Sequence, residues 1–128
     1  RLSTATVYDS PLSTPDADAF GGAARLGAPA PDAPITRPDC GDGYLLESLS
    51  GGFELLHVAD GEPPDVPAGV TLRVIGKDLV DASGAFAARF DASPGATYLL
   101  RPDHHLCARW RRADRAGIEA AMRRALGH

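Results

Sequence analysis

The sequence predicts one α/β domain, in which helices flank a central mixed sheet and an extended N-terminal arm comes first. Two observations carry this prediction. The chain has 128 residues, 44% of them hydrophobic, which is enough for one packed core and too few for two. Its first 40 residues are rich in proline and small residues, whereas strand-like and helix-like apolar segments alternate beyond them. We therefore divide the chain into an arm, residues 1–40, and a domain, residues 41–128.

The arm contains too many prolines for a helix or a long strand. We expect it to be extended, with a short strand at residues 5–8, and to pack over a neighbouring surface or to join two domains. The chain begins with Arg1 and not with methionine, which indicates a piece of a larger protein.

The domain opens with GYLLESLSGG, residues 43–52. Leu45 and Leu49 are four positions apart and two glycines follow, which predicts a short amphipathic helix. FELLHV, residues 53–58, and VTLRVIG, residues 70–76, are apolar and β-prone, so each is predicted to be a strand. The prolines within residues 60–69 predict a loop between them.

The C-terminal part of the sequence predicts two helices around a hairpin. Phe86 and Phe90 fall on one face of a helix at residues 85–90, and residues 97–110 predict two strands joined by a turn. Asp114 is expected to cap a last helix with apolar residues every four positions, namely Ile118, Met122 and Leu126. The order helix, strand, loop, strand, helix, hairpin, helix fits a central mixed sheet and is that of the second part of a thioredoxin-like fold.

The predicted hairpin has a polar tip made of Arg101, Pro102 and Asp103. Proline suits the second position of a β-turn, and an aspartate side chain accepts hydrogen bonds from backbone amides just beyond it. We therefore predict a structural turn formed by these three residues.

The residues after this turn, His104, His105 and Cys107, suggest an alternative interpretation as a metal site. Only His105 and Cys107 would share a face of a strand, which supplies two ligands where zinc requires three or four. The turn is the better interpretation. Cys40, 67 positions before Cys107, completes neither a CxxC nor a zinc quartet, so both thiols are expected to be free, reduced and buried.

The sequence predicts no catalytic, cofactor-binding or metal-ligating residue. Cys107 lies within a predicted strand between apolar neighbours, which would raise the pKa of its thiol. His57 is interpreted as a strand residue and not as a general base. Gly41-Asp-Gly43 begins like a dinucleotide-binding fingerprint but no strand precedes it, and the chain has no P-loop.

The charge of the chain is unevenly distributed. Its net charge is −4; residues 1–100 carry 6 basic and 14 acidic side chains, net −8, and residues 101–128 carry 7 basic and 3 acidic ones, net +4. The basic end lacks interleaved aromatics, so it predicts a solvated or partner-facing helix and no nucleic-acid partner. No apolar run approaches the roughly 20 residues that cross a bilayer, and no secretory pattern is present. We expect no membrane contact and a cytoplasmic location.

Four segments of the sequence resemble one protein family. DSPLSTPD, GAPAPDAPI, LLESLSGGFELL and YLLRPDHHLCARW are similar to the C-terminal region of FAD-dependent aromatic-ring hydroxylases of the phenol hydroxylase and hydroxyphenylpropionate hydroxylase type. The resemblance runs from about Asp9 to the end of the chain. It implies a thioredoxin-like domain that binds no cofactor itself, downstream of FAD-binding and substrate domains that handle FAD, NAD(P)H and O2.

The sequence departs from thioredoxin and from the family at three places. The redox cysteines of thioredoxin would lie near residues 59–63, where this chain has none, and Ala96 stands where a proline would precede the next strand. His104 stands where many relatives of the hydroxylase type carry glycine. A dithiol activity is therefore not expected.

Three functions follow as hypotheses. The first is a non-catalytic thioredoxin-like domain of an aromatic-ring monooxygenase, serving stability, packing against the other domains, or formation of a homo-oligomer. The second is a free-standing thioredoxin-like thiol or peroxide-handling protein, which would need an exposed cysteine of low pKa. The third is a small metal-binding module built on His104, His105 and Cys107.

Overall fold

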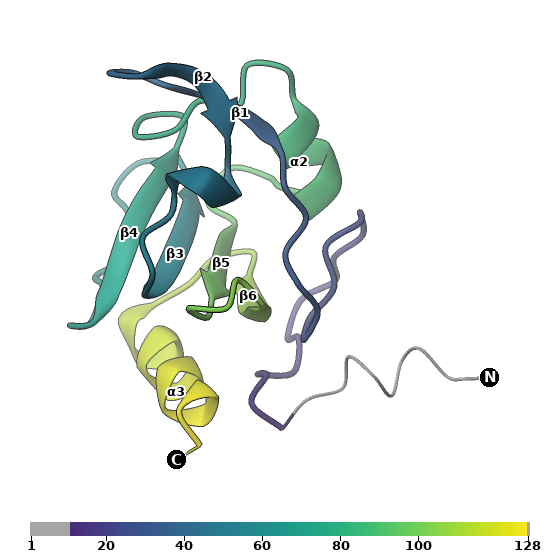
Figure 1. Cartoon of the computed structure of the whole chain (residues 1–128). Coiled ribbons are helices and arrows are strands. Elements are labelled where there is room, and N and C mark those ends of the chain that lie inside the picture. The colour runs from purple at the N-terminus through teal and green to yellow at the C-terminus, as the bar shows by residue number, and fades with distance from the viewer. Residues whose placement is uncertain (1–10, 128) are drawn as a thin grey trace.

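A computed structural model of the chain describes residues 11–127 (Figure 1). The strand predicted at residues 5–8 lies outside the described residues. The elements, in chain order, are β1 (Pro34–Arg37), β2 (Gly41–Tyr44), the 3-10 helix η1 (Leu46–Ser48), β3 (Phe53–Val58), β4 (Val70–Ile75), α2 (Ala85–Phe90), β5 (Thr97–Leu100), β6 (Leu106–Trp110) and α3 (Arg115–Ala125).

The main sheet has four strands in the order β4-β3-β5-β6. β3 and β4 are parallel, whereas β3 pairs with β5, and β5 with β6, in antiparallel fashion. The mixed α/β class is confirmed, as are the strands predicted within residues 53–110. The connection between β3 and β4 is the predicted proline-rich loop and contains no helix. The thioredoxin-like assignment stays a prediction.

The two faces of this sheet are covered by different elements. On one face, Phe86 and Phe90 of α2 stack at 4.4 Å between ring centroids, and Phe90 lies edge-on to Tyr98 of β5 at 5.2 Å. Tyr98 donates its hydroxyl hydrogen bond to the carbonyl of Phe90 at 2.9 Å, so this buried phenol is satisfied. On the other face, Ile118 of α3 packs into a second cluster of buried residues with Leu55 of β3.

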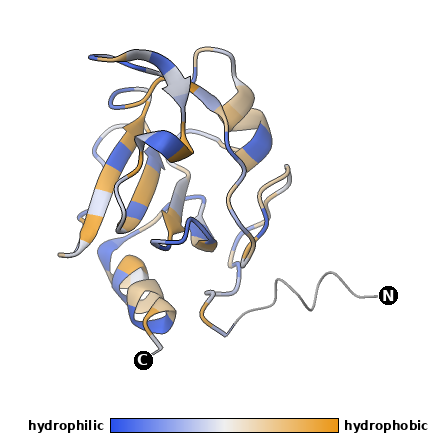
Figure 2. Cartoon of the chain, viewed as in Figure 1, coloured by the Kyte–Doolittle hydropathy of each residue, from blue (hydrophilic) through white to orange (hydrophobic). Residues whose placement is uncertain are grey.

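The last helix forms where the sequence predicts, but the expectation that Leu126 belongs to its apolar face is wrong. The Asp114 carboxylate accepts a hydrogen bond from the amide of Gly117 at 2.8 Å, which caps the N-terminus of α3. Ile118 is fully buried, whereas Leu126, just beyond the helix, is 56% exposed. Figure 2 shows both hydrophobic and hydrophilic residues along α3. This mixture is expected for an amphipathic helix that packs one face on a sheet.

The helix predicted at residues 43–52 is wrong. Gly43 and Tyr44 belong to β2, which forms an antiparallel ribbon with β1. The Glu47 carboxylate then accepts from the amide of Tyr44 at 2.9 Å, and the Ser48 hydroxyl donates to the Tyr44 carbonyl at 2.8 Å. These local hydrogen bonds leave room for the single turn of η1 only. The ribbon spans the boundary placed at residue 40, since β1 lies in the predicted arm.

Candidate functional site

The hairpin tip between β5 and β6 is a tight turn. The amide of His104 donates to the carbonyl of Arg101 at 2.8 Å, which places Pro102 and Asp103 at the two central positions of the turn. The Asp103 carboxylate accepts from the amide of His105 at 3.1 Å and from the Arg101 guanidinium. Burial acts to raise the pKa of Asp103, but these two donors outweigh it and lower that pKa.

His104 is the fourth residue of this β-turn. Its φ of 67° lies in the left-handed region, where a side chain is strained and glycine is not. A glycine at this position would relieve the strain.

The cysteines and histidines of the hairpin do not converge. Cys107 is buried and its thiol donates to the Leu99 carbonyl at 3.5 Å, and burial raises the pKa of Cys107 to about 12. Cys40 lies in the turn between β1 and β2 and is exposed, so the expectation that it is buried is wrong. Within residues 11–127, no group of three or more His, Cys, Asp or Glu side chains is arranged to hold a metal ion.

His57 is buried near the carboxyl end of β3. Its Nδ1 lies 2.8 Å from the Thr97 hydroxyl, which itself donates to the carbonyl of Gly95 at 3.1 Å. Because a hydroxyl has one proton, Thr97 accepts from His57, which places the imidazole proton on Nδ1. Nε2 is buried and has no hydrogen-bond partner among residues 11–127. Burial lowers the pKa of His57, and Arg112 lowers it further against the opposing effect of Asp60.

The edge where thioredoxin-type cysteines would lie carries a different set of groups. Asp60 follows β3 and its carboxylate is 3.4 Å from the Arg112 guanidinium. Gly95 lies beside this pair, in a turn that Pro94 leads and that the Ala96 amide closes by donating to the Ser93 carbonyl at 2.9 Å. Every described peptide bond is trans. The geometry offers an exposed ion pair and a buried imidazole whose partner, the Thr97 hydroxyl, is itself buried.

The most extensive polar arrangement of the described residues joins the arm to β6. Arg109 donates from Nε to the Asp16 carboxylate at 3.0 Å and from Nη2 at 2.9 Å, and from Nη1 to the carbonyl of Ala24 at 3.1 Å. Its side chain is 8% exposed and that of Asp16 is 28% exposed. This partly buried, bidentate arginine–carboxylate pair holds residues 16–24 against the sheet.

Arg111 repeats this arrangement two residues later. Its amide donates to the Asp18 carboxylate at 2.9 Å, and its guanidinium donates to the carbonyl of Ala19 at 3.0 Å and to the Asp91 carboxylate at 2.6 Å. The Gly21 amide and this guanidinium together lower the pKa of Asp91. The Phe20 ring lies against both guanidinium groups, 3.9 Å from that of Arg111.

The arm also covers the outer edge of β6 with its backbone. The amide of Thr14 donates to the carbonyl of Cys107 at 2.8 Å, and residues 27–30 exchange backbone hydrogen bonds with residues 104–106. Figure 1 shows this part of the arm running past the end of the sheet. We call the arm residues 14–30 together with Arg109 and Arg111 the arginine clasp.

The clasp changes the interpretation of the basic C-terminal end. The sequence predicted that its arginines face a partner or solvent, yet Arg109 and Arg111 bind this chain's own arm. Asp16-Ala-Asp18 and Arg109-Trp-Arg111 have the same spacing in the sequence, but that spacing does not predict the contacts. Residues 14–20 form no strand, and Asp18 binds the backbone amide of Arg111 and not its guanidinium.

Comparisons with known proteins agree with the fold. A family model described as aromatic-ring hydroxylase, C-terminal, matches residues 23–128. A search of curated proteins finds no match. No described helix is long and apolar enough to cross a membrane.

Two solved structures are similar to this chain. One is the flavin-dependent monooxygenase PieE in complex with FAD and substrate, with a TM-score of 0.68 and 19% identity over 94% of this chain and 25% of that one. The other is a ternary complex of aklavinone-11 hydroxylase with FAD and aklavinone, with a TM-score of 0.63 and 20% identity over 78% of this chain and 21% of that one. The chain thus spans between a fifth and a quarter of the length of these proteins.

Proposed function

Since the chain belongs to the family of aromatic-ring hydroxylase C-terminal domains, we propose that it is the non-catalytic C-terminal domain of an FAD-dependent aromatic-ring monooxygenase. In this role it stabilises the parent enzyme by packing against its other domains or by contributing to a homo-oligomer. The parent's N-terminal FAD-binding and substrate domains are its partners. We expect the parent to act in the cytoplasm, where NAD(P)H is available.

The observation that carries the non-catalytic role is the burial or pairing of the domain's chemically reactive groups. The Cys107 thiol is buried with a raised pKa, and a thiol rather than a thiolate is a poor nucleophile. The His57 imidazole is 5% exposed, so a substrate cannot reach it for general acid–base catalysis. Cys40 is exposed, but the other cysteine of the sequence is the buried Cys107, which leaves Cys40 without a second thiol for dithiol chemistry.

The described residues do not fit FAD. A flavin pyrophosphate is held by backbone amides at a helix N-terminus. At α2 those amides are occupied, because the Asp81 carboxylate accepts from Phe86 and Ala87 at 2.9 Å each. At α3 the Asp114 carboxylate takes the same place. Two negative charges at these positions would repel a pyrophosphate.

A direct test of cofactor binding uses the 128-residue chain alone. After purification and dialysis it should show no flavin absorbance, with or without prior incubation with FAD. A retained, stoichiometric flavin band would contradict the assignment of FAD to the other domains.

The role itself is tested in the full-length parent by deleting the segment from Asp9 onwards. We expect a lower melting temperature or a changed oligomeric mass, because the deletion exposes the surface that this domain covers. Turnover per bound flavin should persist in the fraction that still folds. Unchanged stability and mass together with a collapse of turnover per flavin would show that the domain acts in catalysis.

A further inference from the structure

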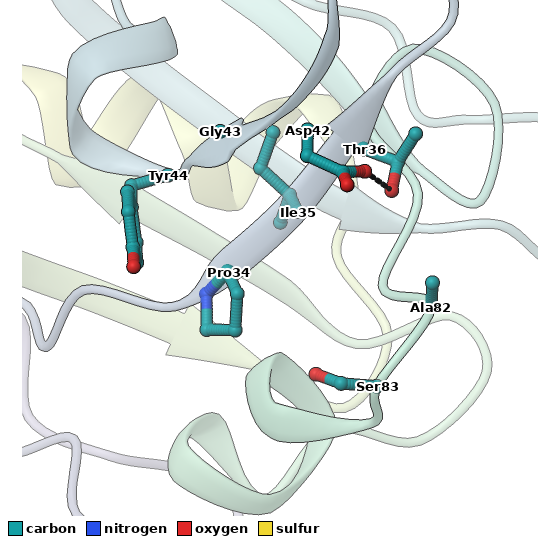
Figure 3. A pocket seen from close by; sticks show the side chains of 8 residues that line it. All are labelled: Pro34, Ile35, Thr36, Asp42, Gly43, Tyr44, Ala82 and Ser83. Atoms are coloured by element: carbon teal, nitrogen blue, oxygen red, sulfur yellow. Dashed lines mark hydrogen bonds between the residues drawn. The ribbon is translucent and has the colours of Figure 1, made fainter.

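A groove lies on the outer face of the β1–β2 ribbon. It has a volume of about 370 Å3 and is bounded by the ribbon and by Ala82 and Ser83, which precede α2. Figure 3 shows the Pro34 ring beside Tyr44, with the hydrogen-bonded side chains of Asp42 and Thr36 further along the ribbon. Ile35 and its partner Gly43 line the groove as well. Ile35 is 3% exposed, whereas Asp42 and Tyr44 are exposed.

Of the three large hydrophobic side chains that the described residues expose, Tyr44 lines the groove, and Val80 lies beside the ribbon but outside the groove's lining. Tyr44 is 55% exposed and Val80 is 38% exposed; Val80 exchanges two backbone hydrogen bonds of 2.8 Å with Thr36 of the ribbon. The third such residue, Leu126, lies beyond α3 and outside this groove. A tyrosine beside a proline at a hollow is typical of a protein contact surface.

The groove carries a negatively charged side chain that no cation of the described residues pairs with. The Asp42 carboxylate is exposed and accepts one hydrogen bond, from the Thr36 hydroxyl at 3.1 Å, and it pairs with no cation of the described residues. Asp39, in the turn of the ribbon, is also exposed and forms no ion pair with them. Arg37 leans towards Glu47 at 3.9 Å, and the arginines of the clasp are occupied by Asp16 and Asp91.

An arginine side chain fits this combination better than other cations. Its guanidinium can lie on the Tyr44 ring and hydrogen-bond the Asp42 carboxylate, since residues two apart on a strand are on the order of 7 Å apart. The clasp uses the same chemistry, with Phe20 against Arg109 and Arg111 while carboxylates hold their nitrogens. We infer that this groove receives an arginine of the parent chain's preceding domains, an inference that rests on the proposed function.

The preceding domains are a better candidate for the occupant than a second copy of this chain, because the similar proteins are several times longer and because the preceding domains are covalently attached. This chain covers 21% and 25% of the similar solved proteins, so a large covalently attached surface is available in a parent of that size. Attachment through a short linker raises the effective concentration of that surface to the order of millimolar, whereas a second copy must associate from solution.

The test is hydroxyl-radical footprinting of the full-length enzyme and of the 128-residue chain, read by peptide mass spectrometry. Tyr44 and Leu126 form a matched pair because they are 55% and 56% exposed. In the full-length enzyme we expect labelling of Tyr44 to fall about fivefold, as for a side chain that becomes roughly 10% exposed in an interface core. Labelling of Leu126 should stay unchanged. An Asp42→Asn variant should restore part of the labelling at Tyr44.

Three results would overturn the inference. Equal labelling of Tyr44 in both proteins would show that the groove stays open, and the proposed function would still stand or fall by the deletion experiment. Protection that disappears on dilution of the enzyme to monomers would identify a second copy as the occupant. Protection that is unaffected by Asp42→Asn would exclude a cation paired with that carboxylate.

Discussion

Replacing Arg109 by methionine should loosen the N-terminal arm from β6. The substitution removes a guanidinium that contacts both Asp16 oxygens at 2.9 to 3.2 Å and the Ala24 carbonyl at 3.1 Å, while it keeps an apolar stem against Phe20. Breaking a buried ion pair costs about 3 to 5 kcal/mol. Because the Asp16 side chain is 28% exposed and can be rehydrated, we expect the lower end, about 3 kcal/mol, or roughly 10 °C in melting temperature.

Urea unfolding of the chain measures this effect through the fluorescence of Trp110, the one tryptophan of the sequence, which lies on β6 beside the clasp. Arg112→Met is the matched control. That arginine is 77% exposed and 3.4 Å from Asp60, so its loss should cost at most about 0.5 kcal/mol. Equal destabilisation by the two substitutions would refute the reasoning. So would additive effects of Arg109→Met and Asp16→Asn, because paired residues must show a coupling energy.

Three further predictions concern the hairpin, the cysteines and His57. His104→Gly should raise the unfolding free energy by about 1 kcal/mol, since it relieves a left-handed backbone at φ 67°; a lower urea midpoint would contradict this. Cys40 should react with a disulfide reagent at pH 8 in the native chain, whereas Cys107, with its pKa raised to about 12, should react only on unfolding; equal native rates would contradict the burial. The pKa of His57 is lower in the folded state than in the unfolded state. As the pH falls, the unfolded state therefore takes up this proton at a higher pH than the folded state does, and the unfolding free energy decreases below about pH 6.5. A His57→Gln variant should show a smaller loss between pH 7.5 and pH 5, and an identical loss would assign the pH dependence to other groups.

The strands and the last helix follow from local patterns. FELLHV and TYLL are rich in large apolar residues, because β3 and β5 lie at the centre of the sheet and are covered on both faces. Their buried polar side chains, Glu54, His57 and Thr97, are hydrogen-bonded. α3 follows from its Asp114 cap and a four-residue apolar spacing. In each case the local sequence and the tertiary packing favour the same secondary structure, which is the condition for a reliable prediction.

The β1–β2 ribbon could not be predicted in the same way. Pro34 suggested irregular structure, yet a proline is tolerated as the first residue of a strand on an exposed edge. The Leu45 and Leu49 spacing suggested a helix, but Leu45 is buried by the pairing of the ribbon beside it and the helical turn ends at Ser48. The two strands of the ribbon are separated by residues 38–40 alone, and Pro38-Asp39 followed by Gly41 at φ 81° is a hairpin-turn signal. The signal was missed because the segment was interpreted by the composition of its neighbourhood, which is rich in proline and small residues.

The clasp was missed for a related reason. Asp16 and Arg109 are 93 positions apart, so each was interpreted by the composition of its own neighbourhood, one as part of a loop and the other as part of a basic end. The turn of Arg101, Pro102 and Asp103 is the opposite case, because its hydrogen-bonding groups are neighbours in the sequence, between Arg101 and His105.

The arm's backbone contacts with β6 bear on where this domain can be cut. A sheet edge with free amides and carbonyls is a template on which other molecules can add strands, and proteins cover such edges to avoid aggregation. Thr14 and residues 27–30 occupy that edge of β6. A fragment that starts at the first regular strand, β1, would keep every described helix and strand of the fold and still present a bare edge of Leu106 and Cys107 to its neighbours. The proline-rich segment that resembles a linker therefore covers the β6 edge of the sheet, and we expect a fragment without it to aggregate more readily.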